Sequence, residues 1–136
     1  MFSTLHGDEI LATGSESIPT RAWQARAPRG GDAPAAQQIR EVFFDATRNS
    51  RTGIIYFKVV NAAGTAQRIK VQISGASKIK PEGEAVVLAA GSLNDTNSIE
   101  EPQKVVPHTE KVTGLSADFT REFPAYSITV LKLKVK

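Results

Sequence analysis

The sequence contains no cysteine among its 136 residues. This absence excludes disulfide bonds, thiolate metal sites and cysteine nucleophiles, and it leaves the cellular compartment undecided. No apolar run approaches the roughly 20 residues that a membrane-spanning helix needs, so we expect no membrane partner. The first eight residues lack the basic region and the apolar core of a signal peptide. A periplasmic or extracellular location therefore requires a targeting signal on a longer parent protein, and a cytoplasmic location is the alternative.

Clusters of like charge are also lacking. The formal net charge is +3, from 17 basic and 14 acidic residues, and lysine and arginine alternate with apolar residues instead of gathering in one run. This dispersed pattern is weak support for nucleic-acid binding, and we expect no nucleic-acid partner. The hydrophobic fraction of 40% and the length are typical of one soluble domain with a single core.

Helical periodicity is absent from every stretch of ten or more residues, whereas short runs with strand patterns recur between turn signals. Residues 53–60 are almost continuously apolar, and residues 67–73 alternate strictly between apolar and polar side chains. The short segment between them contains Asn61 and Gly64, which favour a tight turn, so we predict that these two runs form a central hairpin. The whole of residues 1–136 is predicted to be one all-β domain, an antiparallel β-sandwich of jelly-roll type.

Further strands are expected on both sides of this pair, at residues 8–12, 40–47, 84–89, 104–106, 110–113 and 125–135. In the last of these, the apolar parity changes between Val130 and Leu131. A one-residue change of parity is typical of a β-bulge, so we predict one there.

Residues 13–38 show no periodicity and are rich in glycine and proline, which predicts a long irregular loop. Trp23 lies in the middle of this segment. The favoured interpretation is that Trp23 anchors the loop to the sandwich, and the alternative is an exposed platform for sugar stacking.

Candidate catalytic or metal-binding groups are few. His6 and His108 have no partner at helical spacing and are interpreted as surface or loop histidines instead of metal ligands. Residues 94–101 are rich in oxygen ligands but lack the spacing of a calcium loop, which favours a loop capped by its own side chains. The same segment contains a formal glycosylation sequon, Asn94-Asp95-Thr96.

Paired carboxylates are needed for glycoside hydrolysis, and two pairs stand close in the sequence. Glu100 and Glu101 are adjacent, so on a strand they would point to opposite faces. Glu82 and Glu84 could share a face, but they flank an apparent exposed turn. We interpret all four as solvated carboxylates and expect no catalytic residue, no cofactor and no metal.

Four parts of the sequence resemble α-L-arabinofuranosidases of glycoside hydrolase family fifty-one. The first is the pair of segments MFS and GDEIL, near the end of that family's catalytic barrel. The second combines ATR with the strand GIIYFKVVN, the third combines NDTNSIEEP with KVVP, and the fourth is FPAYSITVL. The matching residues are 1–3, 7–11, 46–48, 53–61, 94–102, 104–107 and 123–131.

The resemblance implies the C-terminal β-sandwich of a retaining hydrolase that releases terminal α-L-arabinofuranosyl residues from arabinan or arabinoxylan without a cofactor. In that family a (β/α)₈ barrel carries both catalytic glutamates, one of them within an Asn-Glu pair. This sequence has no Asn-Glu pair, and a barrel needs about 250 residues. We therefore expect a non-catalytic domain that supports an absent barrel, with residues 1–6 as the stump of the last barrel helix.

The expected partners are the catalytic barrel and, through the parent enzyme, an arabinose-containing polysaccharide, with homo-oligomer formation as a further expectation. This hypothesis predicts an exposed apolar patch where the barrel is missing. The alternatives are a stand-alone carbohydrate-binding module, in which Trp23 would contact sugar, and an unrelated β-sandwich interaction domain.

Overall fold

A computed structural model describes residues 3–76 and 78–136, and within them the chain forms ten strands and no helix. The strands are β1 (Glu9–Ile10), β2 (Thr20–Trp23), β3 (Gln37–Arg40), β4 (Val42–Arg48), β5 (Ile54–Asn61), β6 (Gln67–Gln72), β7 (Gly83–Ala89), β8 (His108–Val112), β9 (Asp118–Phe123) and β10 (Ser127–Lys134). The all-β prediction is confirmed. The described residues include no helix long and apolar enough to cross a membrane.

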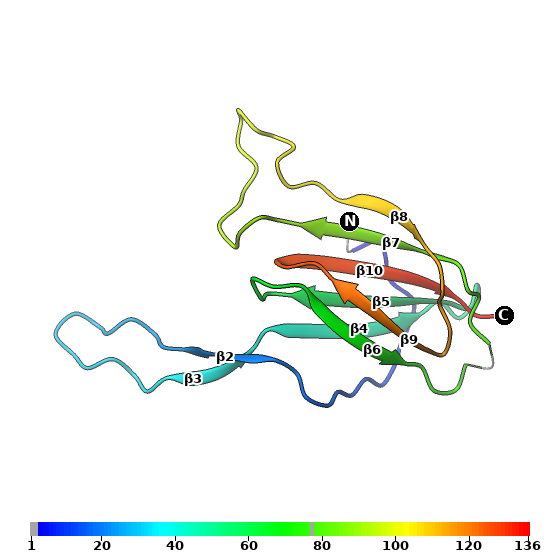
Figure 1. Cartoon of the computed structure of the whole chain (residues 1–136), viewed down its shortest axis with the longest axis horizontal. Coiled ribbons are helices and arrows are strands. Elements are labelled where there is room, and N and C mark those ends of the chain that lie inside the picture. The colour runs from blue at the N-terminus through cyan, green and yellow to red at the C-terminus, as the bar shows by residue number, and fades with distance from the viewer. Residues whose placement is uncertain (1–2, 77) are drawn as a thin grey trace.

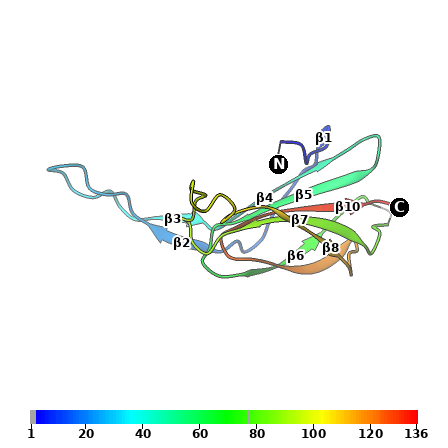
Figure 2. The same ribbon diagram turned by 90° about the horizontal axis from the view of Figure 1, so that it is seen from above.

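Eight of the ten strands form two layers. The larger sheet has the order β1-β4-β5-β10-β7-β8, and all of its pairings are antiparallel. Strands β6 and β9 pair with each other and form the second layer, which crosses in front of the larger sheet in Figure 1. The view turned by 90° shows β6 on one side of β5, β10 and β7 of the larger sheet (Figure 2). The predicted antiparallel β-sandwich is therefore confirmed.

The core lies between these two layers. Alternating residues of the larger sheet point inward because successive side chains of a strand face opposite sides. Val59, Leu131 and Leu133 from this sheet are at most 1% exposed, and Phe119 and Phe123 from β9 meet them in one buried cluster. Burying each of these large side chains contributes about 1.5–3 kcal/mol, so this interface carries most of the stability of the domain.

The predicted hairpin between β5 and β6 is wrong, because the two strands belong to different sheets. Strand β5 pairs with β4 and β10, whereas β6 pairs with β9. The buried Asn61 explains why the chain crosses over instead of turning back. Its side-chain amide donates to the carbonyl oxygens of Thr65, Phe123 and Pro124 at 2.9, 3.2 and 2.8 Å, and its Oδ1 accepts the N–H of Ala63 at 3.0 Å. Asn61 thus ties the β5–β6 crossing to the β9–β10 crossing.

The β-bulge predicted between Val130 and Leu131 is also wrong. Strand β10 keeps an unbroken register with β5 and β7, in which Val130 lies opposite Lys58 and Val86. Val130 and Leu131 point to opposite faces, yet both are fully buried. The change of apolar parity in the sequence therefore reflects a central strand that is covered on both faces at this point, and not an inserted residue.

Residues 13–38 contain more regular structure than the predicted irregular loop. Strands β2 and β3 pair with each other and form a two-stranded ribbon that projects from one end of the sandwich (Figure 1). A two-stranded ribbon with little buried area gives only weak periodicity, which is why the sequence pattern missed it. The strand predicted at residues 104–106 is wrong as well, since those residues lie in a loop.

The N-terminal segment packs against the turn between β4 and β5. Strand β1 lies in the predicted segment 8–12 and pairs with Arg48 and Thr47. A side chain at Gly7 would lie 2.1 Å from the backbone of Arg48, so this close approach requires glycine. Asp8 accepts hydrogen bonds from the backbone N–H and the hydroxyl of Ser50. Residues 3–6 form a turn and a bend instead of a helix, and Met1 and Phe2 lie outside the described residues. The origin of residues 1–6 as the stump of a barrel helix stays a prediction.

Candidate functional site

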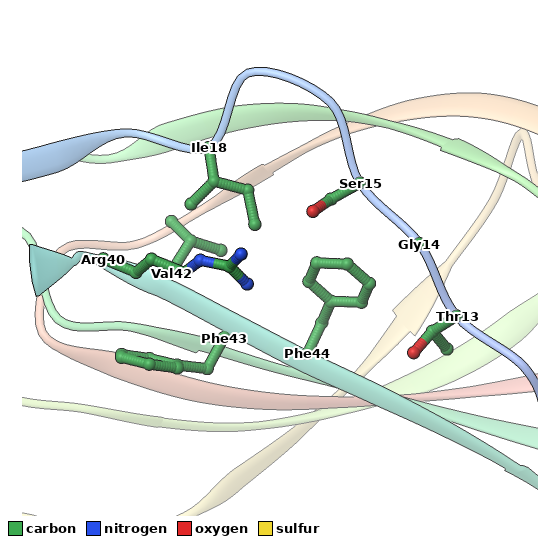
Figure 3. Close-up of a pocket in the computed structure, with 8 residues that line it drawn as sticks. All are labelled: Thr13, Gly14, Ser15, Ile18, Arg40, Val42, Phe43 and Phe44. Carbon is green, nitrogen blue, oxygen red and sulfur yellow. The ribbon is translucent and has the colours of Figure 1, made fainter.

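A small pocket lies at the base of the ribbon, between the segment 13–18 and strand β4 (Figure 3). The guanidinium group of Arg40 extends into this space, on the same side of β4 as Phe44, Ser15 and Ile18. Phe43 lies on the other side of the strand. The pocket has a volume of about 380 Å³, and its lining residues are Thr13, Gly14, Ser15, Ile18, Arg40, Val42, Phe43 and Phe44.

A wider groove continues from this pocket along the inner face of the larger sheet. Its floor contains Phe44 and Phe57, whose rings lie 6.2 Å apart, and its walls are the segment 11–19 and strand β6. The groove exists because the second layer has only two strands and leaves part of the six-stranded sheet uncovered. Its volume is about 1360 Å³.

The second candidate region is the loop of residues 91–107, which connects β7 to β8 and extends away from the sandwich in Figure 1. Leu93, Ile99 and Val106 in this loop are 59%, 100% and 46% exposed. Three large apolar side chains are therefore presented to solvent by one segment. Interaction sites of soluble proteins carry exposed apolar surface, so this loop is a candidate interaction region.

Side chains of the 91–107 loop fix its shape. The carboxylate of Asp95 accepts the N–H groups of Gly91 and Ser92 at 2.8 and 3.0 Å. Asn97 accepts the N–H of Val105 at 2.7 Å and donates to the carbonyl oxygen of Val105 at 3.0 Å, so its side chain connects two segments of the loop. The prediction of a loop capped by its own side chains is confirmed.

The oxygen atoms that would be the calcium ligands of this segment are thus used in loop closure. Ser98 also contributes, because its hydroxyl accepts the N–H of Glu101 at 2.9 Å. Lys104 Nζ lies 3.4 Å from Asp95 Oδ1 and 3.9 Å from Glu101 Oε2. Among residues 3–76 and 78–136, no group of three or more histidine and acidic side chains is placed to hold a metal ion.

The electrostatics of the loop favour a charged Asp95. Desolvation acts to raise the pKa of Asp95, but the N–H groups of Gly91 and Ser92 and the ammonium of Lys104 act against it, and the net effect lowers the pKa below its usual value. A catalytic acid of a glycoside hydrolase needs the opposite, a raised pKa. Asp95 is therefore suited to structure and not to proton donation.

The carboxylates singled out from the sequence lie at the surface. Glu84 pairs with Lys132 at 3.1 Å, Glu101 lies near Lys104, and Glu82 is exposed in the turn before β7. The interpretation of these groups as solvated carboxylates agrees with their exposure. The expectation that the chain holds no catalytic residue stays a prediction.

The two histidines are both exposed. A ring nitrogen of His6 lies 3.0 Å from the carbonyl oxygen of Gly7, and His108 is the first residue of β8, opposite Val87. Their interpretation as surface histidines is confirmed.

Trp23 is the last residue of β2 and lies directly opposite Gln37 of β3. It is 45% exposed and is not among the residues packed in the core cluster. The interpretation of Trp23 as an anchor to the sandwich is therefore wrong, because the ribbon carries it away from the core. Sugar stacking by Trp23 stays a prediction.

The Arg40 pocket was not predicted. No motif surrounds Arg40, and its neighbours across the pocket, Thr13 and Ser15, stand 25 or more positions earlier in the sequence. Only the fold brings them together. In contrast, Ile99 and Val106 of the 91–107 loop stand within motifs that are visible in the sequence.

A profile of the α-L-arabinofuranosidase C-terminal domain family matches residues 1–127. The chain belongs to this family. The extracellular exo-α-L-arabinofuranosidase of Streptomyces chartreusis is 34% identical over 103 residues, which are 76% of this chain and 12% of that protein. The family resemblance seen in the sequence is thus confirmed.

Solved structures show the same fold. The arabinose-bound MgGH51 α-L-arabinofuranosidase matches 99% of this chain with a TM-score of 0.72 at 24% identity, and the match covers 18% of that structure. The GH51 enzyme of Thermotoga petrophila matches 96% of this chain with a TM-score of 0.78 at 18% identity, over 26% of its own length. The 136 residues therefore correspond to the C-terminal domain of much longer enzymes, and the catalytic barrel is not among them.

Proposed function

We propose that this chain is the non-catalytic C-terminal domain of an α-L-arabinofuranosidase and that it supports the catalytic barrel by packing against it through the 91–107 loop. The parent enzyme would be a retaining hydrolase of terminal α-L-arabinofuranosyl residues in arabinan or arabinoxylan. The observation that carries this proposal is the exposure of Leu93, Ile99 and Val106 on one loop with a fixed shape.

The fixed shape of this loop supports docking. A flexible loop would lose conformational entropy on binding, at a cost of about 1–2 kcal/mol for each ordered residue. The internal hydrogen bonds of Asp95, Asn97 and Ser98 order the loop when the domain folds, so this entropy is not lost again on binding. The loop can therefore present its apolar side chains to a partner without further ordering.

Other features of the parent follow from the same proposal. The polysaccharide substrate would be bound by the barrel, and homo-oligomers of the parent would form through surfaces outside the core of this domain. An extracellular location is proposed from the name of the Streptomyces chartreusis relative.

Calorimetric titration of the chain with the catalytic barrel of a family enzyme that lacks its own C-terminal domain tests the proposal. The unmodified chain is expected to bind. Burial of an isoleucine side chain contributes about 1.5–3 kcal/mol, so Ile99→Asp is expected to weaken binding at least about tenfold.

Trp23→Asp is the matched control, because Trp23 is 45% exposed but lies on β2 of the ribbon, outside the loop and outside the N-terminal segment that would join the barrel. We expect this variant to bind within about twofold of the unmodified chain, as is usual for a surface change away from an interface. Equal loss of binding in both variants, or no binding by the unmodified chain, would contradict docking through the 91–107 loop.

A further inference from the structure

Among the residues that the structure describes, Arg40 has no acidic partner. It is the last residue of β3 and lies opposite Thr20. The neighbouring Arg21 lies 3.7 Å from the carboxylate of Glu41, whereas no salt bridge of Arg40 occurs in the part of the chain that the structure describes. A guanidinium group has five N–H donors in a planar fork that matches the two oxygens of a carboxylate. The fork of Arg40 is therefore available to an anion from outside the chain.

The surroundings of Arg40 suit an anion that carries a sugar ring. Hydroxyl groups of Thr13 and Ser15 line the pocket from the opposite segment, and Ile18 and Phe44 supply apolar surface beside the guanidinium (Figure 3). Ligand sites for small molecules combine apolar walls with a few polar groups in this way. A sugar acid presents the matching groups, namely a carboxylate, several hydroxyls and an apolar ring face.

The charge distribution also favours an anion at this end of the domain. Residues 20–40 hold four arginines and one aspartate, which leaves thirteen basic and thirteen acidic residues in the rest of the chain. The formal net charge of +3 therefore belongs to the ribbon and its base. A local excess of positive charge attracts anions and speeds their association.

The size of the pocket separates a sugar acid from larger anionic partners. A cavity of about 380 Å³ is within the usual range for small-ligand sites, about 300–1,000 Å³, whereas a nucleic-acid duplex is contacted over an extended protein surface of about 1,000–2,500 Å². We infer that the Arg40 pocket binds a uronic-acid residue of an acidic, arabinose-containing polysaccharide. The polysaccharide source of this residue rests on the proposed function, whereas the recognition of a carboxylate beside sugar hydroxyls does not.

Titration of the ¹⁵N-labelled chain with methyl glucuronoside, followed by NMR, tests the inference. The amide signals that move are expected to be those of residues 13–18 and 40–44. Arg40→Gln removes a charge-assisted bidentate contact and is expected to weaken binding at least about tenfold. Arg40→Lys keeps the charge but loses the fork, so we expect an affinity between those of the other two proteins.

Arg26→Gln is the matched control, because it removes one ribbon charge outside the pocket, and it is expected to change the affinity less than about twofold. Equal losses in Arg26→Gln and Arg40→Gln would overturn the inference, as would signals that move elsewhere in the domain. Methyl glucoside or acetate binding as tightly as methyl glucuronoside would also overturn it, because both the ring and the carboxylate are required. A DNA oligonucleotide that binds the Arg40 pocket more tightly than methyl glucuronoside, and displaces it, would overturn the inference and reassign the site to nucleic acid.

These measurements use the chain alone and need no catalytic barrel. Failure to bind the glucuronoside would leave the docking of the 91–107 loop untouched. Conversely, failure to bind a barrel would leave the recognition of the carboxylate by Arg40 intact and would remove only the assignment to a polysaccharide.

Discussion

Replacing Asn61 by alanine should destabilise the domain more than any surface substitution, because Asn61 holds together both crossings between the two sheets. The side chain is 1% exposed and contacts three carbonyl oxygens and one N–H group. Asn61→Ala keeps the fold of β5 but leaves these backbone groups without their partner. Phe123, one of the residues that lose a hydrogen bond, is itself fully buried.

The magnitude follows from the hydrogen bonds. The two amide hydrogens and the one accepting oxygen make about three hydrogen bonds, each with a net contribution of about 1 kcal/mol. A buried carbonyl left without a partner adds a cost of about 1–3 kcal/mol. We therefore expect a loss of about 4 kcal/mol, a large part of the 5–15 kcal/mol that is typical of a domain. With an unfolding entropy of about 2.1 cal/mol/K per residue, this corresponds to a fall in Tm of roughly 14 °C.

Thermal and urea unfolding followed by circular dichroism measure this loss. Gln72→Ala is the control, because Gln72 is also an amide in a strand, but it makes one exposed hydrogen bond of 3.1 Å, to Asp118. We expect Gln72→Ala to change stability by less than about 0.5 kcal/mol. A loss below about 1 kcal/mol for Asn61→Ala would refute the claim that this side chain couples the two crossings.

Three further predictions concern stability and sugar contact. Thr129 is fully buried, and its hydroxyl has no hydrogen-bond partner in the described structure. Thr129→Val should therefore stabilise the domain by about 1 kcal/mol, measured by urea unfolding. A loss of stability would show that the hydroxyl has a partner. The side-chain and backbone hydrogen bonds from Ser50 lower the pKa of Asp8 in the folded state. Asp8 therefore contributes to folding stability above its unfolded pKa, near 4, and this contribution is lost as the pH falls through the lower folded value. Asp8→Asn should flatten the loss of stability on acidification, and an unchanged acid profile would count against this role. Trp23 is the single tryptophan, so the tryptophan fluorescence of the chain reports on it alone. If Trp23 stacks on sugar, arabinoxylan should shift the emission and Trp23→Ala should abolish binding. An unchanged spectrum at saturating polysaccharide would exclude stacking.

The positions of most strands could be predicted from the sequence, but their partners could not. Alternation in residues 67–73 correctly indicates a strand with one buried face, and the apolar run of residues 53–60 correctly indicates a strand near the centre of a sheet. Their pairing depends on Asn61, whose hydrogen bonds to Phe123 and Pro124 span more than 60 residues. The local sequence pattern holds no information on contacts of that range. Asn61 and Gly64 are both common in turns, and this predicted a hairpin instead.

The candidate sites show the same division. The oxygen-rich segment 94–101 could be interpreted as a capped loop because its hydrogen bonds are local, over two to eight residues. The Arg40 pocket could not be predicted, because it needs the segment 13–18 to lie across β4. Trp23 was misplaced for a related reason: a single large aromatic residue usually packs in a core, and only the ribbon topology removes it from one.

The resemblance to a family supplied what the pattern of residues alone did not. Periodicity and composition gave a β-sandwich without a function, and the motifs near Gly7, Asn61 and residues 94–107 indicated the enzyme family. Each of these motifs has a structural role in the fold. Gly7 allows the close approach to Arg48, Asn61 couples the crossings, and the 94–107 segment makes most of the exposed apolar loop.

The central claim is that the reactive groups of the parent enzyme lie on its barrel and not on these residues. Hydrolysis of 4-nitrophenyl α-L-arabinofuranoside by the purified chain alone measures this directly. The release of nitrophenol is expected to equal the rate in buffer, at every pH between 4 and 8. Turnover that follows the folded chain through purification and disappears when one of its acidic residues is replaced by the corresponding amide would contradict the claim.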